Sequence, residues 1–584
     1  MRVAVAQFAT SLNIQENLAS CLRVINEASV CAPSLIVLPE YCNTQPYYTD
    51  QHQAWEQALA TDGDFLHQIA EQAKKHHCYL VLNVTMRRDA TRDLADNIQN
   101  SSIKSNISVT SCLFSPDGKI IQRADKQKLT PHESIFFITT SKAVEVANTP
   151  FGQLGFLTGN DDITFEASSE LANHGAQLLC HSLSSFALDN SSLHGPARAC
   201  ENKVFVASAN KIGSLISKEQ IPPQDIAPEY HVGIGQSQII APNGKVLAKL
   251  AHNKEGFIFA DIDMSECDMQ TKSNRYRPDG TEILSQRRPE LYQQLIEPIN
   301  QASSHADQNS VPVTANVAIF ATYKSNEQAI EDVCHYIENN LSDIIQLPEL
   351  FFVDDKVSTH NHDQRTQIES LSKKLIAQVS SVLRPFQYLC TSLIIEGMHQ
   401  AVLISEHGLI ATQQQLHFCK RYQWTELGDE INTIEIPLEQ GLINAAMLTA
   451  DDANIAEIVK VAALTGIQVL LVPFDIQEPC EVEYSLLSRA AENRICIVAA
   501  SREKSLTDDL PTDNSPHNSH NQKKVKAKKA TGLIANLTSD SPALAQWKSR
   551  KFDGYINQPL VKYQHGKITK AVIHPIAACN KLIY

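Results

Sequence analysis

The chain has 584 residues, with 50 Lys and Arg against 65 Asp and Glu, a net charge of −15 and 43% hydrophobic residues. This composition is typical of globular chains with large buried cores, and the acidic balance argues against binding to the phosphate backbone of nucleic acids. No run approaches the about 20 apolar residues of a membrane span, and the chain opens on a strand pattern rather than a signal peptide. We therefore expect a cytoplasmic protein without nucleic-acid or membrane partners.

The 14 cysteines are scattered along the chain without a Cys-x-x-Cys pair. Structural zinc sites use closely spaced pairs, and long chains without a leader keep their thiols reduced. We interpret these residues as buried thiols, and we expect no metal and no cofactor.

Short β-rich runs alternate with helical patterns along the chain. The strand pattern 3–10 is followed by an apolar helical stripe over 17–32 and by a second buried run at 35–38. A further helical pattern covers 64–76, and the strand pattern 79–82 follows it. This alternation predicts an α/β protein in which helices cover sheets.

The same order of motifs returns in the second half of the chain, which predicts a tandem repeat. The recurring pairs are the strand 3–10 with 317–322, Leu-Pro-Glu40 with Leu-Pro-Glu349, and Arg198–Asn202 with Arg489–Asn493. The Glu pair is 309 residues apart and the Arg pair 291, so the second copy is 18 residues shorter between these motifs. We place the loss in the polar stretch 87–105, the predicted connection of a β-hairpin.

The repeat defines a first domain over 1–300, a polar linker over 301–312 and a second domain over 313–584. A further polar stretch, 503–530, ends in the run Lys523–Lys529 and has too few apolar residues to order itself. We interpret it as a disordered, solvated insertion in the second domain. A nucleic-acid patch fits the acidic chain less well.

Three charged residues of the first copy follow predicted strands. Glu40 ends the motif Leu-Pro-Glu, Lys126 follows the strand pattern 119–122, and Glu133 comes seven residues later. Any one of them alone is an ordinary surface charge, so their interpretation depends on the motifs around them.

Those motifs closely resemble the nitrilase superfamily, the carbon–nitrogen hydrolases. The matching segments follow the family's order across nearly all of 1–295, and a weaker ordered match covers 313–584. They are Val5–Phe8, Leu38–Tyr41, Pro116–Gly118, Lys126–Leu129, Asn173–Leu178, Arg198–Asn202, Gly235–Ser237, Pro242–Gly244 and Arg287–Tyr292. The resemblance implies two tandem four-layer αββα sandwiches. Because family members pair such sandwiches into dimers, it also implies an internal pseudo-dimer, to which further oligomerisation could add.

Family members cleave non-peptide amides, carbamoyl groups or nitriles. A Glu activates a Cys thiolate, a Lys stabilises the oxyanion, and a second Glu positions or relays protons. By resemblance, Glu40 would be the base, Lys126 the oxyanion stabiliser and Glu133 the second carboxylate. The implied ligand is a small amide- or carbamoyl-type molecule.

The nucleophile position departs from the family. The Cys should stand two residues before an Asp, but Gly159 occupies that position in the first copy and Ala450 in the second. The two positions are 291 residues apart, as the Arg motif is, so a misalignment does not explain the substitution.

The second copy has lost more of the pattern. Glu349 remains, but the position of Lys126 is predicted to fall on Leu416 or His417. Lys420 would replace it only if the loop slipped by three or four residues.

Several groups could stand in for the missing thiol of the first copy: Thr158, Cys42, Cys180 or a water activated by Glu40. One function is therefore a catalytically impaired hydrolase of small amides. The alternative is a non-catalytic pseudoenzyme that binds a small carbonyl ligand or a protein partner. The second copy fits only the alternative.

Overall fold

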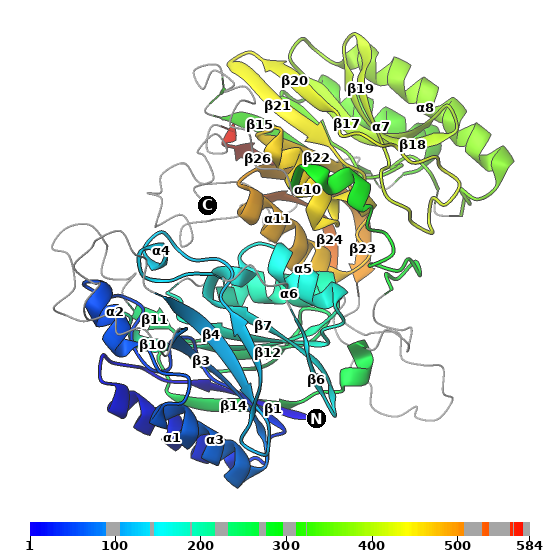
Figure 1. Cartoon of the computed structure of the whole chain (residues 1–584). Coiled ribbons are helices and arrows are strands. Elements are labelled where there is room, and N and C mark those ends of the chain that lie inside the picture. The colour runs from blue at the N-terminus through cyan, green and yellow to red at the C-terminus, as the bar shows by residue number, and fades with distance from the viewer. Residues whose placement is uncertain are drawn as a thin grey trace, which may run out of the picture. The chain divides into compact units, whose positions relative to one another are not determined.

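The computed structural model divides into two compact units, unit 1 from Met1 to Arg275 and unit 2 from Tyr276 to Tyr584 (Figure 1). The residues it describes are 1–88, 106–139, 145–186, 190–216, 232–267, 276–295, 311–312, 314–322, 324–354, 356–506, 528–535, 561–563 and 566–575. Most of the predicted linker 301–312 lies outside them.

Unit 1 contains two six-stranded sheets. The first has the order β14-β1-β2-β3-β4-β5, with β1 (Arg2–Gln7), β2 (Leu35–Val37), β3 (Tyr79–Arg87), β4 (Ile107–Phe114), β5 (Ile120–Asp125) and β14 (Gly256–Asp261). The second has the order β13-β12-β9-β8-β7-β6, with β6 (Ala147–Thr149), β7 (Gly152–Thr158), β8 (Leu178–Leu183), β9 (Phe205–Asn210), β12 (Gln238–Ile240) and β13 (Val246–Lys249). A small ribbon pairs β10 (Ile212–Ser214) with β11 (Val232–Ile234).

Helices cover the outer faces of the two sheets in unit 1: α1 (Ile14–Ser29), α3 (Asp64–His76), α5 (Glu166–Asn173) and α6 (Gly195–Asn202). Two shorter helices, α2 (Gln51–Gln57) and α4 (Glu133–Phe136), pack together beside β4. One core joins the facing sheets through residues such as Val5 and Leu178. A second core packs α1 and α3 on the first sheet, and a third packs α5 and α6 on the second sheet. These layers confirm the predicted α/β class and form an αββα sandwich (Figure 1).

Unit 2 also contains two facing sheets. The first has the order β19-β18-β17-β16-β15-β26-β25, with β15 (Ala315–Thr322), β16 (Ile344–Gln346), β17 (Tyr388–Ile395), β18 (Met398–Ser405), β19 (Gly408–Gln414), β25 (Val561–Tyr563) and β26 (Gly566–Ile573). The second has the order β20-β21-β22-β23-β24, with β20 (Thr433–Leu438), β21 (Gly441–Met447), β22 (Val469–Pro473), β23 (Cys496–Leu506) and β24 (Lys528–Ala535). Its helices are α7 (Asn326–Glu338), α8 (His362–Val382), α9 (Ala450–Ala453), α10 (Ala456–Leu464) and α11 (Leu486–Asn493). A shared core fills the space between the sheets, and α7 and α8 pack on the first one.

The two units differ in the length of one hairpin connection. In unit 1, β3 and β4 pair out to Arg87 opposite Ile107, whereas in unit 2 the pairing of β17 and β18 reaches Ile395 opposite Met398. The unit 2 hairpin therefore closes within two residues. The second copy is therefore shorter at this hairpin connection, which is where the sequence predicts the loss.

The prediction of disorder over 503–530 is wrong at both ends of the segment. Strand β23 continues to Leu506, β24 begins at Lys528, and these two residues pair in an antiparallel ladder. Such a ladder satisfies backbone N–H and C=O groups without needing apolar side chains, so the polar composition did not reveal it. Residues 507–527, which include Lys523, lie outside the described residues.

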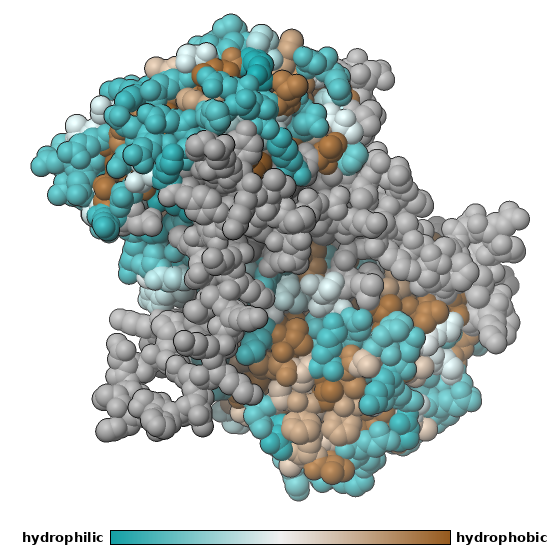
Figure 2. All heavy atoms as spheres, turned by 180° about the vertical axis from the view of Figure 1, so that it is seen from behind, coloured by the Kyte–Doolittle hydropathy of each residue, from teal (hydrophilic) through white to brown (hydrophobic). Residues whose placement is uncertain are grey.

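Two further predictions concern the membrane and the cysteines. Among the described helices, none combines the length and the apolar composition of a membrane span. The described cysteines are all free thiols and most are buried, as predicted. Both units expose large apolar side chains, such as Leu247 and Phe259 in unit 1 and Leu341 and Phe386 in unit 2. In the view from behind, hydrophobic residues gather on the visible part of unit 1 (Figure 2).

Candidate functional site

A sharp turn after β2 places Glu40 in the interior of unit 1. The Glu40 N–H donates to the Leu183 carbonyl at 3.2 Å, which ties the turn to the end of β8 in the other sheet. Tyr41 adopts the left-handed region with φ +54°, and its N–H donates to the Asn83 side chain at 3.0 Å. A non-glycine residue is held in that conformation only by such surroundings. The Glu40 carboxylate is thereby fixed in the interior, where the residue is 1% exposed.

The structure brings the three predicted charged residues of unit 1 together. The Lys126 Nζ lies 2.8 Å from Glu40 Oε1 and 2.6 Å from Glu133 Oε1, and all three side chains are buried. The second oxygen of Glu133 accepts the Thr130 N–H at 2.7 Å, and the Tyr41 hydroxyl donates to Glu133. Residues from the ends of β2 and β5 and from the start of α4 therefore form one hydrogen-bonded cluster.

Burial and neighbouring charges have opposite effects on the pKa values of Lys126 and Glu133. Burial lowers the pKa of Lys126, but the carboxylates of Glu133 and Glu40 outweigh that effect and raise it overall. Burial likewise raises the pKa of Glu133, and the Lys126 ammonium more than reverses it. Near neutral pH the cluster therefore holds a buried ammonium beside an ionised Glu133.

Gly159 stands directly against this cluster. Its φ is +53°, and a Cβ built on it would lie 2.5 Å from Lys126 Nζ and 2.8 Å from Glu40 Oε1. The absence of a side chain at this position is therefore what allows Lys126 to reach Glu40 in this arrangement.

Asp161 connects the turn at Gly159 to the loop that carries Lys126. Its carboxylate accepts main-chain N–H groups from Lys128 at 2.8 Å, from Thr158 at 3.0 Å and from Gln127 at 3.2 Å. Burial raises the pKa of Asp161 to about 6. Asp161 therefore acts as a positioning residue for the loop that carries the lysine.

The predicted substitutes for the thiol are engaged elsewhere. The Thr158 hydroxyl lies 3.1 Å from Ser111 Oγ, and the Cys42 thiol donates to the Pro39 carbonyl at 3.1 Å. Cys180 lies in the core between the sheets, where burial raises the pKa of its thiol.

Sequence reasoning missed two polar residues beside Glu40. The Ser184 hydroxyl donates to Glu40 Oε2 at 2.8 Å. The buried Lys211 ammonium donates to the carbonyls of Tyr41 at 2.9 Å and Thr44 at 2.8 Å, and burial lowers its pKa to about 7. Ser184 directly follows the parallel strand β8, and functional side chains often lie just after such strands. This position in the sequence could have pointed to Ser184.

Unit 2 places Glu349 after β16 as unit 1 places Glu40 after β2. Its N–H donates to the Phe474 carbonyl at 3.2 Å, and the next residue, Leu350, has φ +40°. The carboxylate accepts hydrogen bonds from Arg421 at 3.1 Å and from the Tyr422 hydroxyl at 3.0 Å. The cation in contact with this carboxylate is therefore an arginine.

The predicted counterpart of Lys126 is wrong by one residue. Asp452 accepts the N–H groups of Leu416 at 3.0 Å and His417 at 2.9 Å. In unit 1, Asp161 accepts the N–H groups of the two residues that follow Lys126 in the same way. Gln415, which precedes Leu416, is thus the counterpart of Lys126. The segment from Gly408 to Gln415 is one residue shorter than the matching segment from Gly118 to Lys126. Such a local change of length leaves no signal in the sequence.

Arg421 is the cation that the sequence analysis missed. Besides Glu349, its guanidinium contacts Asp451 at 2.7 Å and Asp475 at 2.5 Å. Burial raises the pKa of Glu349 to about 8; Arg421 opposes this shift, and the other two carboxylates add to it. The predicted substitute Lys420 instead places its Nζ 6.0 Å from the centre of the Tyr276 ring.

The described part of unit 2 also holds one group of potential metal ligands. Asp279, Cys419 and Asp451 have ligand atoms within 4.8 Å of one another. The Asp451 carboxylate already pairs with the Arg421 guanidinium, which supplies the positive charge that a cation would bring. We assign no metal to this group.

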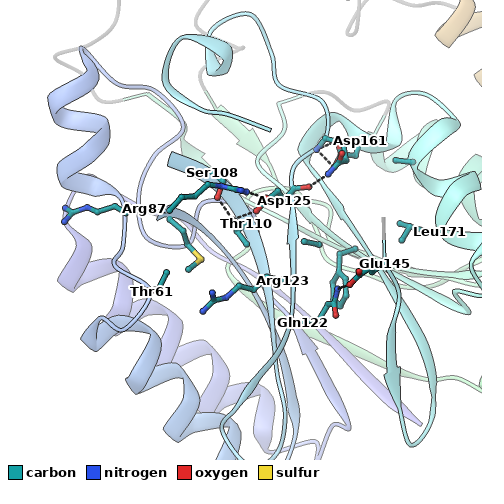
Figure 3. A pocket seen from close by; sticks show the side chains of 16 residues that line it. Thr61, Arg87, Ser108, Thr110, Gln122, Arg123, Asp125, Glu145, Asp161 and Leu171 are labelled. Atoms are coloured by element: carbon teal, nitrogen blue, oxygen red, sulfur yellow. Dashed lines mark hydrogen bonds and ion pairs between the residues drawn. The ribbon is translucent and has the colours of Figure 1, made fainter. Parts of the chain in front are cut away.

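A polar pocket of about 290 Å³ lies beside the unit 1 cluster, between β5 and α5 (Figure 3). Its charged lining includes Arg87, Arg123, Asp125, Glu145 and Asp161. Asp161 lines this pocket, but Lys126, Glu40 and Glu133 do not.

Comparisons with known proteins find similarity over about half of the chain. Residues 2–270 match the family model described as carbon-nitrogen hydrolase. The chain is 26% identical over 302 residues to the omega-amidase NIT2-B of Xenopus laevis, covering 49% of this chain and 98% of the relative. It is 25% identical over 294 residues to the nitrilase and fragile histidine triad fusion protein NitFhit of Caenorhabditis elegans, covering 50% of this chain but only 61% of NitFhit. The crystal structure of that NitFhit protein aligns with a TM-score of 0.41 at 23% identity, covering 50% of this chain and 66% of the other.

The variant Gly159→Ala tests the close approach of Lys126. A side chain in the left-handed region costs roughly 1–2 kcal/mol, and the new methyl group would also displace the Lys126 ammonium. We expect the free energy of unfolding, measured by urea denaturation, to fall by more than this backbone cost. Gly397→Ala is the control, because its φ is +75° and its Cβ would have open space. Equal losses in the two variants would contradict the predicted contact.

The raised pKa of Glu349 predicts a pH-dependent stability. Its ordinary value is 4.5 and its folded value about 8, so between these values the native state holds a proton that the unfolded state releases. Stability should therefore decline as pH rises through this window, by at most about 1.4 kcal/mol per pH unit. Glu349→Gln should remove that decline in denaturation curves, and the exposed Glu435→Gln should keep it. Parallel pH profiles of the wild type and Glu349→Gln would contradict the assignment.

Proposed function

Residues 2–270 belong to the carbon–nitrogen hydrolase family, and we propose that unit 1 hydrolyses a small non-peptide amide without a cysteine nucleophile. The observation that carries this proposal is the contact between Glu40 and Lys126, 2.8 Å long and buried. A general base and a cation for a developing oxyanion are thereby held side by side in a site of low dielectric constant. Relatives named omega-amidase and nitrilase support the choice of substrate class.

Each charged residue of the unit 1 cluster has a separate role in this proposal. Glu40 accepts the proton of the attacking group. Lys126 stabilises the negative charge that develops on the carbonyl oxygen. Glu133 keeps Lys126 protonated and in place, because its own carboxylate is fixed by the Thr130 N–H and the Tyr41 hydroxyl.

Unit 2 is non-catalytic in this proposal. The folded pKa of Glu349 is about 8, so near pH 7 the side chain is mostly protonated and is a poor general base. Arg421 already balances the charges of three acidic side chains. Ala450 contributes no nucleophile.

A binding protein without catalysis is the second candidate. The observation that favours it is the absence of a reactive side chain at both Gly159 and Ala450. Such a pseudoenzyme would hold a small carbonyl ligand at Lys126, or a protein partner, and release no product.

We also propose that the two units are tandem copies of one fold. Both carry a Glu after a short strand, followed by a residue with positive φ, namely Tyr41 and Leu350. In both, the Asp two residues after Gly159 or Ala450 accepts two successive N–H groups from the loop that follows the first sheet. The family's dimeric pairing would then become an internal pseudo-dimer.

Ammonia release tests the hydrolase proposal. The purified full-length chain would be assayed with ω-amides, carbamoyl amines, carbamoyl amino acids and nitriles. We expect turnover of an amide that falls by about 10³-fold or more in Glu40→Gln, because the base is lost. Glu349→Gln, the matching change in unit 2, should keep the wild-type rate. Folded protein that binds an amide but releases no ammonia would favour the pseudoenzyme.

The internal pairing predicts the behaviour of an isolated fragment. Residues 1–275, which make up unit 1, should dimerise or aggregate when expressed alone, because the apolar surface that pairs with the second copy in this proposal would be exposed. Size-exclusion chromatography with light scattering reports this directly. A well-behaved monomeric fragment would contradict the pairing.

A further inference from the structure

A serine hydroxyl shares the Glu40 carboxylate with Lys126. Ser184 Oγ donates to Glu40 Oε2 at 2.8 Å, while Lys126 Nζ donates to Glu40 Oε1 at 2.8 Å. One buried base therefore holds a hydroxyl on one oxygen and a cation on the other. A nucleophile within hydrogen-bond reach of a base, beside an oxyanion stabiliser, is the arrangement that covalent acyl transfer requires.

The end of β8 keeps Ser184 at this position. The Leu183 carbonyl accepts the N–H groups of both Glu40 and Lys211 at 3.2 Å, which fixes the strand end against the turn after β2. Ser184 itself is only partly buried, whereas Glu40 and Lys126 are almost fully buried. Ser184 is therefore the most exposed member of this cluster.

Gly159 makes this arrangement sterically possible. A Cβ at that position would come within 2.8 Å of the Glu40 oxygen that Lys126 contacts, so any side chain there would compete for the same space. Of the other nearby nucleophiles, Thr158 shares a hydrogen bond with the Ser111 hydroxyl, and Cys42 donates to a main-chain carbonyl.

We infer that Ser184 is the nucleophile of unit 1, an inference that rests on the proposed amide hydrolysis. Ser184 Oγ attacks the amide carbon as Glu40 takes the hydroxyl proton, and the C=O electron pair moves to the oxygen beside the Lys126 ammonium. When the tetrahedral intermediate collapses, the C–N bond breaks, Glu40 returns the proton to nitrogen, and ammonia leaves an ester on Ser184.

Water completes the cycle by the same route. Glu40 takes a proton from water, the hydroxide attacks the ester carbon, and the C–O bond to Ser184 breaks. The proton returns to Ser184 Oγ and the carboxylic acid is released. One amide and one water are consumed, and one acid and one ammonia are formed.

Acylation by p-nitrophenyl acetate tests the nucleophile separately from amide turnover. The full-length chain should release p-nitrophenolate in a burst that approaches one equivalent, and peptide mapping should place the acetyl group on Ser184. Ser184→Ala and Glu40→Gln should lose the burst. Ser185→Ala, which removes the neighbouring hydroxyl, should retain it.

Conservative replacement and amide turnover complete the test. Ser184→Cys should restore an acylated enzyme that iodoacetamide inactivates, and Ser184→Ala should lower amide turnover by about 10³-fold or more. Wild-type amide turnover in Ser184→Ala, still dependent on Glu40, would overturn Ser184 in favour of direct attack by water. Acetylation of Ser184 without turnover of any amide would leave the nucleophile in place and overturn the proposed function. Acetylation at other residues alone would overturn the nucleophile.

Discussion

The buried Lys126 ammonium is the interaction on which the unit 1 site depends. A charge removed from water is costly unless it is paired and hydrogen-bonded, and Lys126 meets this condition only because Glu40 and Glu133 converge on it from separate elements. The turn after β2, the loop after β5 and the short helix α4 are each held by main-chain hydrogen bonds that aim these groups. Removing one of the three would leave another with an uncompensated charge.

The two units balance their buried carboxylates in different ways. In unit 1 a lysine stands between two carboxylates, and the raised pKa of Lys126 keeps it charged. In unit 2 Arg421 stands among Glu349, Asp451 and Asp475, and one of these carboxylates, Glu349, takes up a proton near neutral pH. Two similar backbones thereby hold an ionised lysine beside an ionised Glu133 in one unit and an arginine beside a protonated Glu349 in the other.

Gly159 determines how much space is left beside the Glu40 carboxylate. With glycine at position 159, Lys126 occupies the region where a side chain would begin, and Glu40 keeps its second oxygen for Ser184. The unit 1 site is thus a complete hydrogen-bonded arrangement rather than a remnant with one group removed. This is the physical basis for proposing chemistry where the expected nucleophile is absent.

The sequence by itself determined the elements and residues whose signals are local. The helix over 64–76 follows from its apolar spacing, and Glu40, Lys126 and Glu133 follow from short motifs next to strands. Only the tertiary structure brought Ser184 to Glu40, 144 residues away in the chain, and chose Arg421 instead of Lys420. Contacts of that separation depend on how two sheets face each other, and a single residue of loop register decides which side chain reaches a buried carboxylate. Neither leaves a pattern in the local sequence.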